Sequence, residues 1–306
     1  MFGRRRLGHS RLVATLILNF NSRRSAAEVE HVQEALAQRG VAVDQVVIAH
    51  TGDQVRRYAR RAIRGGAKLI IAGGGDGTMT AVVSELAFRE VTLGLLPLGT
   101  GNSFAQSLGI PLDVEGAADV VAGGRSVQVD LGMVNRTYFA NFATIGLAAE
   151  IAHQTPRSLK SVLGIIAYVL AGLRPALSQQ PFVCELRWER QCTRLATKQL
   201  IIASGRVFGN VPLAPDASIT DARLSIFTTT GLSHFELARM YATLALGRHA
   251  ELPDAQHFTA QSVYVRTRPR QRISIDGETW GKTPARFSIA QKALRVLVPS
   301  DFAAGA

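Results

Sequence analysis

The sequence has few cysteines, no long hydrophobic run and few acidic residues. Its two cysteines, Cys184 and Cys192, match neither a zinc site nor a disulfide framework, and we expect both to be buried in strands. The longest apolar run covers residues 161–173, shorter than the roughly 20 residues of a membrane-spanning helix. The apolar stretch Leu12–Leu18 has no small-residue cleavage site after it, so it is better explained as a strand than as a signal peptide. These absences predict a cytoplasmic globular protein without a transmembrane segment.

The shortage of acidic residues leaves a net charge of +12 and a pI of about 10.6. Part of the excess precedes the first acidic residue, Glu28. A second cluster, "RTRPRQR", places arginines at positions 266, 268, 270 and 272, which would share one face of a strand. Such charge favours an anionic membrane or nucleic acid, or forms a solvated surface. Aromatic residues are sparse around the arginines, so we expect no nucleic-acid partner.

The first 130 residues alternate between strand-like and helix-like patterns. We expect strands at 12–18, 41–49, 68–72 and 91–96, and helices at 25–39, 52–64, 78–88 and 103–108. Apolar strands that alternate with helices are typical of a doubly wound parallel sheet, so the fold class is α/β in this half.

After about Asp130 the pattern changes to short alternating runs separated by turn residues. Helical patterns remain only at 159–177 and 233–246. This pattern predicts a second, largely antiparallel domain, either a β-sandwich or an open barrel. The chain of 306 residues is long enough for two domains, which we place at 1–129 and 130–289.

The segment "GGGDGTMT", residues 73–80, follows an apolar strand and precedes a helix. Backbone N–H groups and the helix N-terminus make such a loop an anion site. Neither the P-loop spacing nor the dinucleotide fingerprint G-x-G-x-x-G fits, and the loop carries Asp76 in place of a lysine. A Gly-Lys-Thr sequence at 281–283 is followed by Pro284, where a helix would have to begin, so we dismiss it.

A second glycine loop, "GTGN" at 99–102, follows the next strand and again opens a helix. Parallel sheets bind ligands at the carboxyl ends of their strands. Two such loops on neighbouring strand–helix units therefore predict a ligand site, whereas a single glycine turn is often only a tight turn.

Together, these loops and later segments resemble the diacylglycerol kinase catalytic-domain family, which includes bacterial lipid kinases, sphingosine kinases and ceramide kinases. The matching segments are "GGDGT" (74–78), "PLGTGNSFA" (97–105), "TIGLAAEI" (144–151), "SGRVFGNVPLAPDASITDARLSI" (204–226) and "SIDGE" (274–278). The resemblance implies an NAD kinase-like nucleotide domain, a β-sandwich lipid-substrate domain and an active site in the cleft between them. It also implies that residues 290–306 return to the first domain.

The activity implied is transfer of the γ-phosphate of ATP to a lipid hydroxyl, with Mg²⁺ as cofactor. From the family pattern, the nucleotide would be lined by Thr51, Gly74, Gly75, Asp76, Gly77, Thr78, Met79, Thr80, Gly99, Thr100 and Asn102. Bare phosphates would repel Asp76, so this carboxylate fits best beside Mg²⁺. The alternative is a carboxylate that bonds the backbone of its own loop.

For the acceptor, the resemblance assigns Glu278 as the catalytic base, with Asp76 as the second catalytic residue. Asp276 would then be a positioning or Mg²⁺-linked partner. By itself the Asp-Gly-Glu sequence indicates only a hairpin turn. The family also has a structural metal in the second domain, and the matching positions here are Ser218, Asp221 and Arg223. Alanine at 222 and serine at 225 depart from the family's glycine and aspartate.

The apolar segment 159–177 could form one wall of an acyl-chain cleft, or it could be an ordinary buried helix. Arginines would hold the enzyme peripherally on an anionic membrane. An NAD kinase-like enzyme and a catalytically silent lipid- or nucleotide-binding homologue remain alternatives. The sequence leaves open which lipid is the acceptor, how the enzyme is regulated and whether it forms a homodimer.

Overall fold

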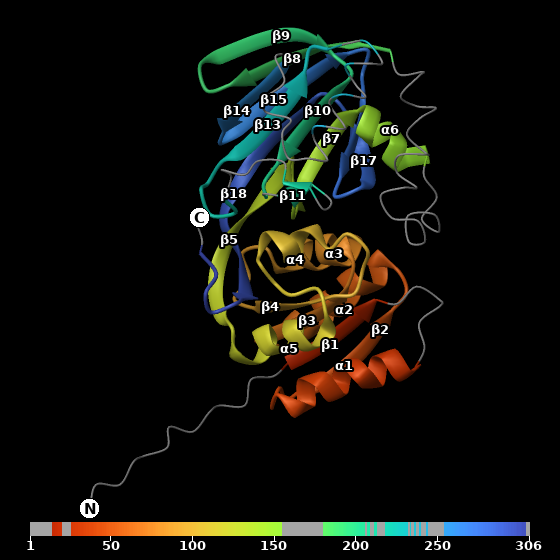
Figure 1. Cartoon of the computed structure of the whole chain (residues 1–306), viewed down its shortest axis with the longest axis vertical. Coiled ribbons are helices and arrows are strands. Elements are labelled where there is room, and N and C mark those ends of the chain that lie inside the picture. Colours follow the sequence, from red (N-terminus) through yellow and green to blue (C-terminus); the bar gives the residue numbers. More distant parts are fainter. Residues whose placement is uncertain are drawn as a thin grey trace, which may run out of the picture.

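The computed structural model describes residues 14–19, 26–154, 180–205, 207–208, 211–212, 218–231, 233, 236, 239, 243 and 254–303. These residues build an α/β part and a β-sandwich, stacked one above the other (Figure 1). The expected helix at 159–177, the N-terminal arginines and most of the expected helix at 233–246 lie outside the described residues.

The α/β part is built on a parallel sheet. Its strand order is β2 (Gln45–Ala49), β1 (Ala14–Asn19), β3 (Leu69–Gly74), β4 (Thr92–Pro97) and β18 (Ala285–Val298). Each neighbouring pair is parallel. The central strand β3, "LIIAGG", is buried along its whole length, as its continuous apolar run predicts for a strand covered on both faces.

Helices cover both faces of this sheet: α1 (Ala26–Gln38), α2 (Gly52–Arg64), α3 (Asp76–Leu86), α4 (Ser103–Ser107) and α5 (Val114–Gly123). α1 packs with α5 and α2 packs with α3, while α3 and α4 lie on the side that faces the sandwich (Figure 1). α2 spans the predicted residues. α5 was not predicted, because glycines and alanines obscure its apolar face; Asp113 caps it by accepting a bond from the Gly116 N–H.

A long antiparallel ribbon, β5 (Arg125–Val134) paired with β18, joins the two parts. One end of β18 pairs with β4 in the parallel sheet, and the other end pairs with β15 (Ser262–Arg268) in the sandwich. The pairing register shifts between Ala290 and Leu294. The ribbon therefore belongs to both parts. The domain limits at 129 and 289 stay a prediction, since both fall within these two strands.

The sandwich is antiparallel, as predicted, and has two sheets. One continues from β18 through β15 to β8 (Phe182–Trp188) and β9 (Gln191–Thr197). The other has the order β14 (Ala255–Ala260), β13 (Leu224–Thr229), β10 (Gln199–Ala203), β7 (Phe142–Gly146), β16 (Arg272–Ile275) and β17 (Glu278–Lys282). Alternate residues of both sheets form one apolar core around Phe139, Phe182 and Phe287. Shorter elements are β6 (Thr137–Phe139), α6 (Leu147–Gln154), β11 (Val207–Phe208) and β12 (Val211–Pro212).

The start of β2 and the exposure of one cysteine differ from the predictions. Strand β2 begins only at Gln45, because residues 41–43 form an irregular segment after α1. Both cysteines lie in strands, and burial raises the pKa of the Cys184 thiol to about 12, but Cys192 is exposed. Among the described residues, we find no helix long and apolar enough to span a membrane.

Candidate active site

The two glycine loops touch each other at the carboxyl ends of β3 and β4. A Cβ placed on Gly99 would lie 2.4 Å from the Cα of Gly75, and one on Gly75 would lie 3.2 Å from the Cα of Gly99. Both distances are shorter than ordinary contacts, so these backbones meet only because both residues lack a side chain. The sequence predicted two neighbouring loops, and the structure brings them into direct contact.

The second loop is held in shape by Asn102. Its backbone is left-handed, with φ of 50°, and its side chain is buried. The amide Oδ1 accepts a bond from the Gly99 N–H at 2.9 Å, and the Nδ2 donates to the Gly99 carbonyl at 2.8 Å. Asn102 thus clamps the loop, a role that explains an asparagine here without direct contact to a ligand.

Asp76 is the first residue of α3 and points toward the second loop. Its carboxylate accepts from the Phe104 N–H at 3.3 Å and from the Ser103 hydroxyl at 3.5 Å. A Cβ on Gly101 would lie 2.8 Å from Oδ2, so glycine is also needed there. Burial, and then the charge of Asp276, raise the pKa of Asp76 to about 6. Two carboxylates in one poorly solvated region are the donors that a divalent cation favours.

Asp276 lies across from this loop, at the tip of the β16–β17 hairpin. Asp276 and Gly277 have φ of 45° and 82°, as in the two-residue turn that the Asp-Gly sequence predicts. The Asp276 carboxylate is buried and accepts four hydrogen bonds, from the N–H groups of residues 140, 141 and 142 at 2.8, 2.9 and 3.1 Å and from the Thr80 hydroxyl at 2.7 Å. Burial outweighs these bonds and raises its pKa.

Glu278, the predicted base, is the first residue of β17 and pairs with Ile275 across the hairpin. Its side chain is partly exposed. It follows Asp276 by two residues, so the bonds that hold Asp276 also set the position of Glu278. The structure thus brings the hairpin that carries Glu278 to the helix that starts at Asp76.

The other predicted nucleotide residues have different environments. The space beside Gly77 is open among the described residues: beyond its own helix backbone, none of their atoms lies within 4 Å of a Cβ placed there. Thr78 is buried and accepts from the Asn19 amide at 2.8 Å. Met79 packs in the apolar core, and its N–H bonds the Gly75 carbonyl, so we do not carry Met79 into the proposed site.

Two threonines and one glycine complete this set. Thr51 caps α2 by accepting from the Gln54 N–H at 3.2 Å, and Thr100 is exposed on the second loop. Gly74 needs to be glycine, because a Cβ there would lie 2.3 Å from the Thr78 hydroxyl.

The predicted metal loop around 218–223 is held by its own hydrogen bonds. The Asp221 carboxylate accepts from the backbone N–H groups of Ser218 at 3.1 Å and Arg223 at 2.9 Å. Ala222 has a left-handed backbone, with φ of 59°, and its N–H bonds the buried Asp130 carboxylate at 2.8 Å. No cluster of three or more metal-binding side chains occurs in the described part of the chain. The metal assignment of these three residues stays a prediction.

The prediction that the arginines of 266–272 share one face of a strand is wrong. Arg266 and Arg268 lie at the end of β15, but Pro269 and a turn follow, and Arg272 begins β16 in the other sheet, 3.3 Å from Glu150. A proline has no N–H to donate to a neighbouring strand, which explains why the strand ends here.

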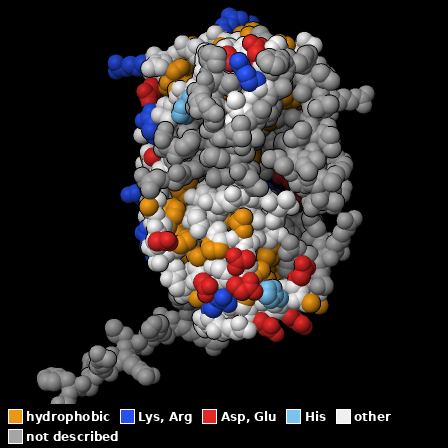
Figure 2. Space-filling view, viewed as in Figure 1, with side chains coloured by type: hydrophobic (Ala, Val, Ile, Leu, Met, Phe, Trp, Pro, Cys, Tyr) orange, Lys and Arg blue, Asp and Glu red, His pale blue; other side chains and the backbone are white. Residues whose placement is uncertain are grey.

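The outer face of β18, β15, β8 and β9 carries a different group of arginines. The pairing register gathers the exposed arginines 187, 194, 266, 268 and 286 around a single carboxylate, Glu185. Figure 2 shows basic side chains at the upper edge of the molecule, over β8 and β9.

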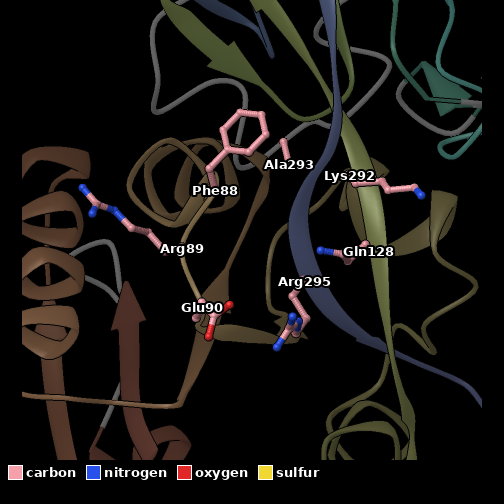
Figure 3. Close-up of a pocket in the computed structure, with 7 residues that line it drawn as sticks. All are labelled: Phe88, Arg89, Glu90, Gln128, Lys292, Ala293 and Arg295. Atoms are coloured by element: carbon pink, nitrogen blue, oxygen red, sulfur yellow. The ribbon is translucent and has the colours of Figure 1, made fainter.

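A small cavity of about 160 Å³ lies elsewhere, where the α3–β4 connection meets the β5–β18 ribbon. Figure 3 shows that Arg89 and Lys292 point away from it, while Glu90, Gln128 and Arg295 lie around its lower half. None of the predicted site residues lines this cavity. The candidate site is therefore the region of the glycine loops, Asp76 and the Asp276 hairpin.

Sequence reasoning missed three features of this site: the N–H groups of residues 140–142, the bond between Thr80 and Asp276, and the contact of Asn19 with Thr78. Each joins segments that are distant in the chain, so no local pattern marks them. The alternating run at 137–146 and the resemblance of the segment "TIGLAAEI" to the family indicated the strand that begins at Phe142, but not its bonds to Asp276.

A parallel sheet with two touching glycine loops, facing a β-sandwich, defines a two-part α/β fold. The profile of the diacylglycerol kinase catalytic domain matches residues 13–134, and that of the YegS C-terminal NAD kinase beta sandwich-like domain matches residues 142–298. The chain therefore belongs to the diacylglycerol kinase catalytic-domain family, a family of lipid kinases.

Curated relatives agree with this assignment, and a solved structure shares the fold. A diacylglycerol kinase of Staphylococcus aureus (strain bovine RF122 / ET3-1) is 31% identical over 248 residues, covering 79% of this chain and 78% of that protein. One from Staphylococcus haemolyticus (strain JCSC1435) is 30% identical over 246 residues, covering 79% of this chain and 74% of that protein. The crystal structure of a diacylglycerol kinase from Bacillus anthracis str. Sterne shares the fold, with a TM-score of 0.76, 19% identity, and coverage of 97% of this chain and 100% of that one.

Proposed function

We propose that this protein is an ATP- and Mg²⁺-dependent kinase that transfers the γ-phosphate to a lipid hydroxyl. The supporting observation is the meeting of three features: two touching glycine loops, the half-buried Asp76 carboxylate, and a hairpin that carries Glu278. The names of the relatives favour diacylglycerol as the acceptor, and a sphingoid-type lipid is the second choice.

The loops suit a polyphosphate. The first turn of α3 presents backbone N–H groups and the positive end of the helix, and the space beside Gly77 is open. Thr100 is exposed on the neighbouring loop. We assign the phosphates to these two loops, with Gly74, Gly75 and Gly99 allowing close approach of the backbone.

Asp76 would hold Mg²⁺, because a carboxylate whose pKa is raised by burial and by a neighbouring negative charge gains most from a bound cation. Mg²⁺ typically takes one or two protein carboxylates together with phosphate oxygens and water, so no larger cluster is needed. When bound, the ion supplies charge neutralisation at the transferring phosphoryl group.

Glu278 acts as the general base in this proposal. Its carboxylate accepts the proton of the lipid hydroxyl as that oxygen attacks the phosphorus in line, and ADP leaves. Asp276 does not share this task, since its oxygens already accept four hydrogen bonds. It positions the hairpin.

The test is transfer from γ-labelled ATP with Mg²⁺ to mixed micelles of diacylglycerol, a sphingoid base, a ceramide or phosphatidylglycerol, with NAD in a parallel reaction. We expect label in a lipid, and a loss of at least about 100-fold in Glu278→Gln and Asp76→Asn. Matched controls are Glu189→Gln, in an exposed turn of the sandwich, and Asp53→Asn, in the first turn of α2 with a side chain 90% exposed. Label in NAD alone, or equal activity in all variants, would overturn the proposal.

We also propose that the enzyme works in the cytoplasm and binds anionic membranes peripherally, through the outer arginine face defined above. Each arginine near an anionic surface contributes about 1 kcal/mol. Replacing Arg266 and Arg268 with glutamate should weaken binding to vesicles containing phosphatidylglycerol by at least about tenfold, measured by co-sedimentation at low salt. The same reversal at Arg57 and Arg61, both exposed on α2, is the control with equal net charge. Equal losses in the two variants would assign binding to net charge and not to this face.

A further inference from the structure

Thr80 lies in α3, one turn after Asp76, and its side chain is buried. Its hydroxyl oxygen is 2.7 Å from Oδ2 of Asp276 and 3.0 Å from the backbone carbonyl of Asp76. Both partners only accept, and the hydroxyl has one proton. The carboxylate is the stronger acceptor, so the proton is directed toward Asp276. The bond joins a helix of the α/β part to a hairpin of the sandwich, 196 residues away in the chain.

Different structures hold the two residues that form this bond. On the helix side, Thr80 is fixed to Asp76 by one turn of α3, so it moves with the glycine loop. On the hairpin side, three backbone N–H groups of the segment 140–142 hold the Asp276 carboxylate, and the Asp276 N–H donates back to the Phe142 carbonyl at 2.9 Å. Glu278 follows two residues later. A shift of either end would change the distance between the glycine loop and Glu278.

We propose that Thr80 is a positioning residue whose hydroxyl sets the placement of the Glu278 hairpin against the Asp76 loop. This inference rests on the proposed kinase function. It also replaces the expectation that Thr80 lines the nucleotide, because its hydroxyl is already used for contact between the two parts. Phosphoryl transfer depends strongly on alignment, and a displacement of about 1 Å can cost on the order of 100-fold in rate.

Three variants separate this role from the alternatives. Thr80→Val keeps the shape of the side chain but removes the hydroxyl donor. Thr80→Ala removes the hydroxyl and also leaves its space empty, whereas Thr80→Ser keeps the hydroxyl. We expect Thr80→Val and Thr80→Ala to lower kcat at least about tenfold, with KM for ATP changed less than about twofold. Thr80→Ser should retain kcat. Ser84→Ala is the control, because that hydroxyl lies one turn further along α3 and bonds only the Thr80 carbonyl at 2.7 Å in the described contacts.

A second measurement does not depend on activity. Hydrogen exchange of the ligand-free protein, followed by mass spectrometry, should show faster exchange in peptides covering 136–146 and 272–282 for Thr80→Val and Thr80→Ala. Wild type, Thr80→Ser and Ser84→Ala should show slow exchange there. The N–H groups of residues 140–142 donate to the Asp276 carboxylate. Loss of the bond from Thr80 to that carboxylate should therefore speed exchange at these N–H groups before other parts of the protein.

The outcomes distinguish the two proposals. If wild-type protein transfers no phosphate, the kinase proposal fails and the exchange data alone decide the role of Thr80. If Thr80→Val raises KM for ATP while kcat is unchanged, Thr80 is a nucleotide residue and the positioning role is wrong. Unchanged kcat together with unchanged exchange in Thr80→Val also overturns it. A tenfold lower kcat with faster local exchange, rescued by Thr80→Ser, supports it.

Discussion

The contact of the Gly75 and Gly99 backbones depends on missing side chains, whereas the turns of the sandwich depend on carboxylates that are present. At the sheet edge, Gly75 and Gly99 meet because neither has a side chain. In the sandwich, Asp276 and Ala222 occupy left-handed backbone that favours glycine, and the carboxylates of Asp276 and Asp130 hold those turns by accepting backbone N–H bonds. The first region should therefore break when atoms are added, and the second when an acceptor is lost.

The largest effect is expected for Gly99→Ala. The new methyl would lie 2.4 Å from the Gly75 Cα, and backbone atoms cannot move aside as a side chain can. We expect a loss of about 3 kcal/mol in the free energy of unfolding and no measurable ATP binding. Urea denaturation and calorimetry provide the measurements. Gly123→Ala, in α5 with open space around it, should instead gain about 0.5 kcal/mol. Equal behaviour of the two variants would contradict the steric explanation.

The contribution of Asp76 to stability should fall as pH rises, because its pKa in the folded protein, about 6, lies above its ordinary value of 3.8. The neutral carboxyl suits the poorly solvated site, so this contribution is fully present below about pH 4 and is lost as pH rises through 6, by at most about 3 kcal/mol. The raised pKa of Asp276 acts in the same direction. Urea denaturation at pH 4.5 and 7.5 without Mg²⁺ should show a smaller decrease in Asp76→Asn than in Asp53→Asn. The same decrease in both would refute the assignment.

Gly77→Ala separates folding from binding. A Cβ at this position contacts no other described part of the chain, so the free energy of unfolding should stay within about 0.5 kcal/mol of wild type. If a phosphate occupies the open space, ATP affinity should fall at least about tenfold, which is about 1.4 kcal/mol. Calorimetric titration with Mg²⁺-ATP measures this, and unchanged affinity would move the phosphates away from the start of α3.

The smallest effect is expected for Ala222→Gly. Its φ of 59° is strained for alanine, and glycine should stabilise the protein by about 0.5–1 kcal/mol. Ala196→Gly, in an exposed position of β9 that shows no positive φ, should destabilise it by a similar amount. Thermal unfolding of both variants provides the comparison. A loss of stability in Ala222→Gly would show that the turn is not strained.

The features that the sequence predicts correctly are those encoded locally. Buried strands such as β3, the helix α2 and the Asp-Gly hairpin follow from short patterns, and the fold class follows from their order. The family resemblance added the roles assigned to Glu278 and Asp76, which stay proposals.

The contacts that position the site were not predictable, because each depends on segments far apart in the chain. Asn102 was expected at the nucleotide, and its clamp on its own loop was not foreseen. Thr80 was expected there as well, and the bond from its hydroxyl to Asp276 was not foreseen. The prediction of one strand face for the arginines of 266–272 was wrong for a similar reason. Its outer face is assembled by strand pairing among β8, β9, β15 and β18, and only two of its members belong to the segment that the sequence indicated.

The pairing of β18 with β4 also has a consequence for synthesis on the ribosome. Residues 295 and 296 of β18 pair with the side of β4 that faces away from β3, and they are synthesised about 200 residues after β4. Until then, the nascent α/β part presents an unpaired, apolar strand edge, a surface prone to pairing with other chains. The parallel sheet of the α/β part can therefore be completed only after the sandwich strands that precede β18 have been synthesised.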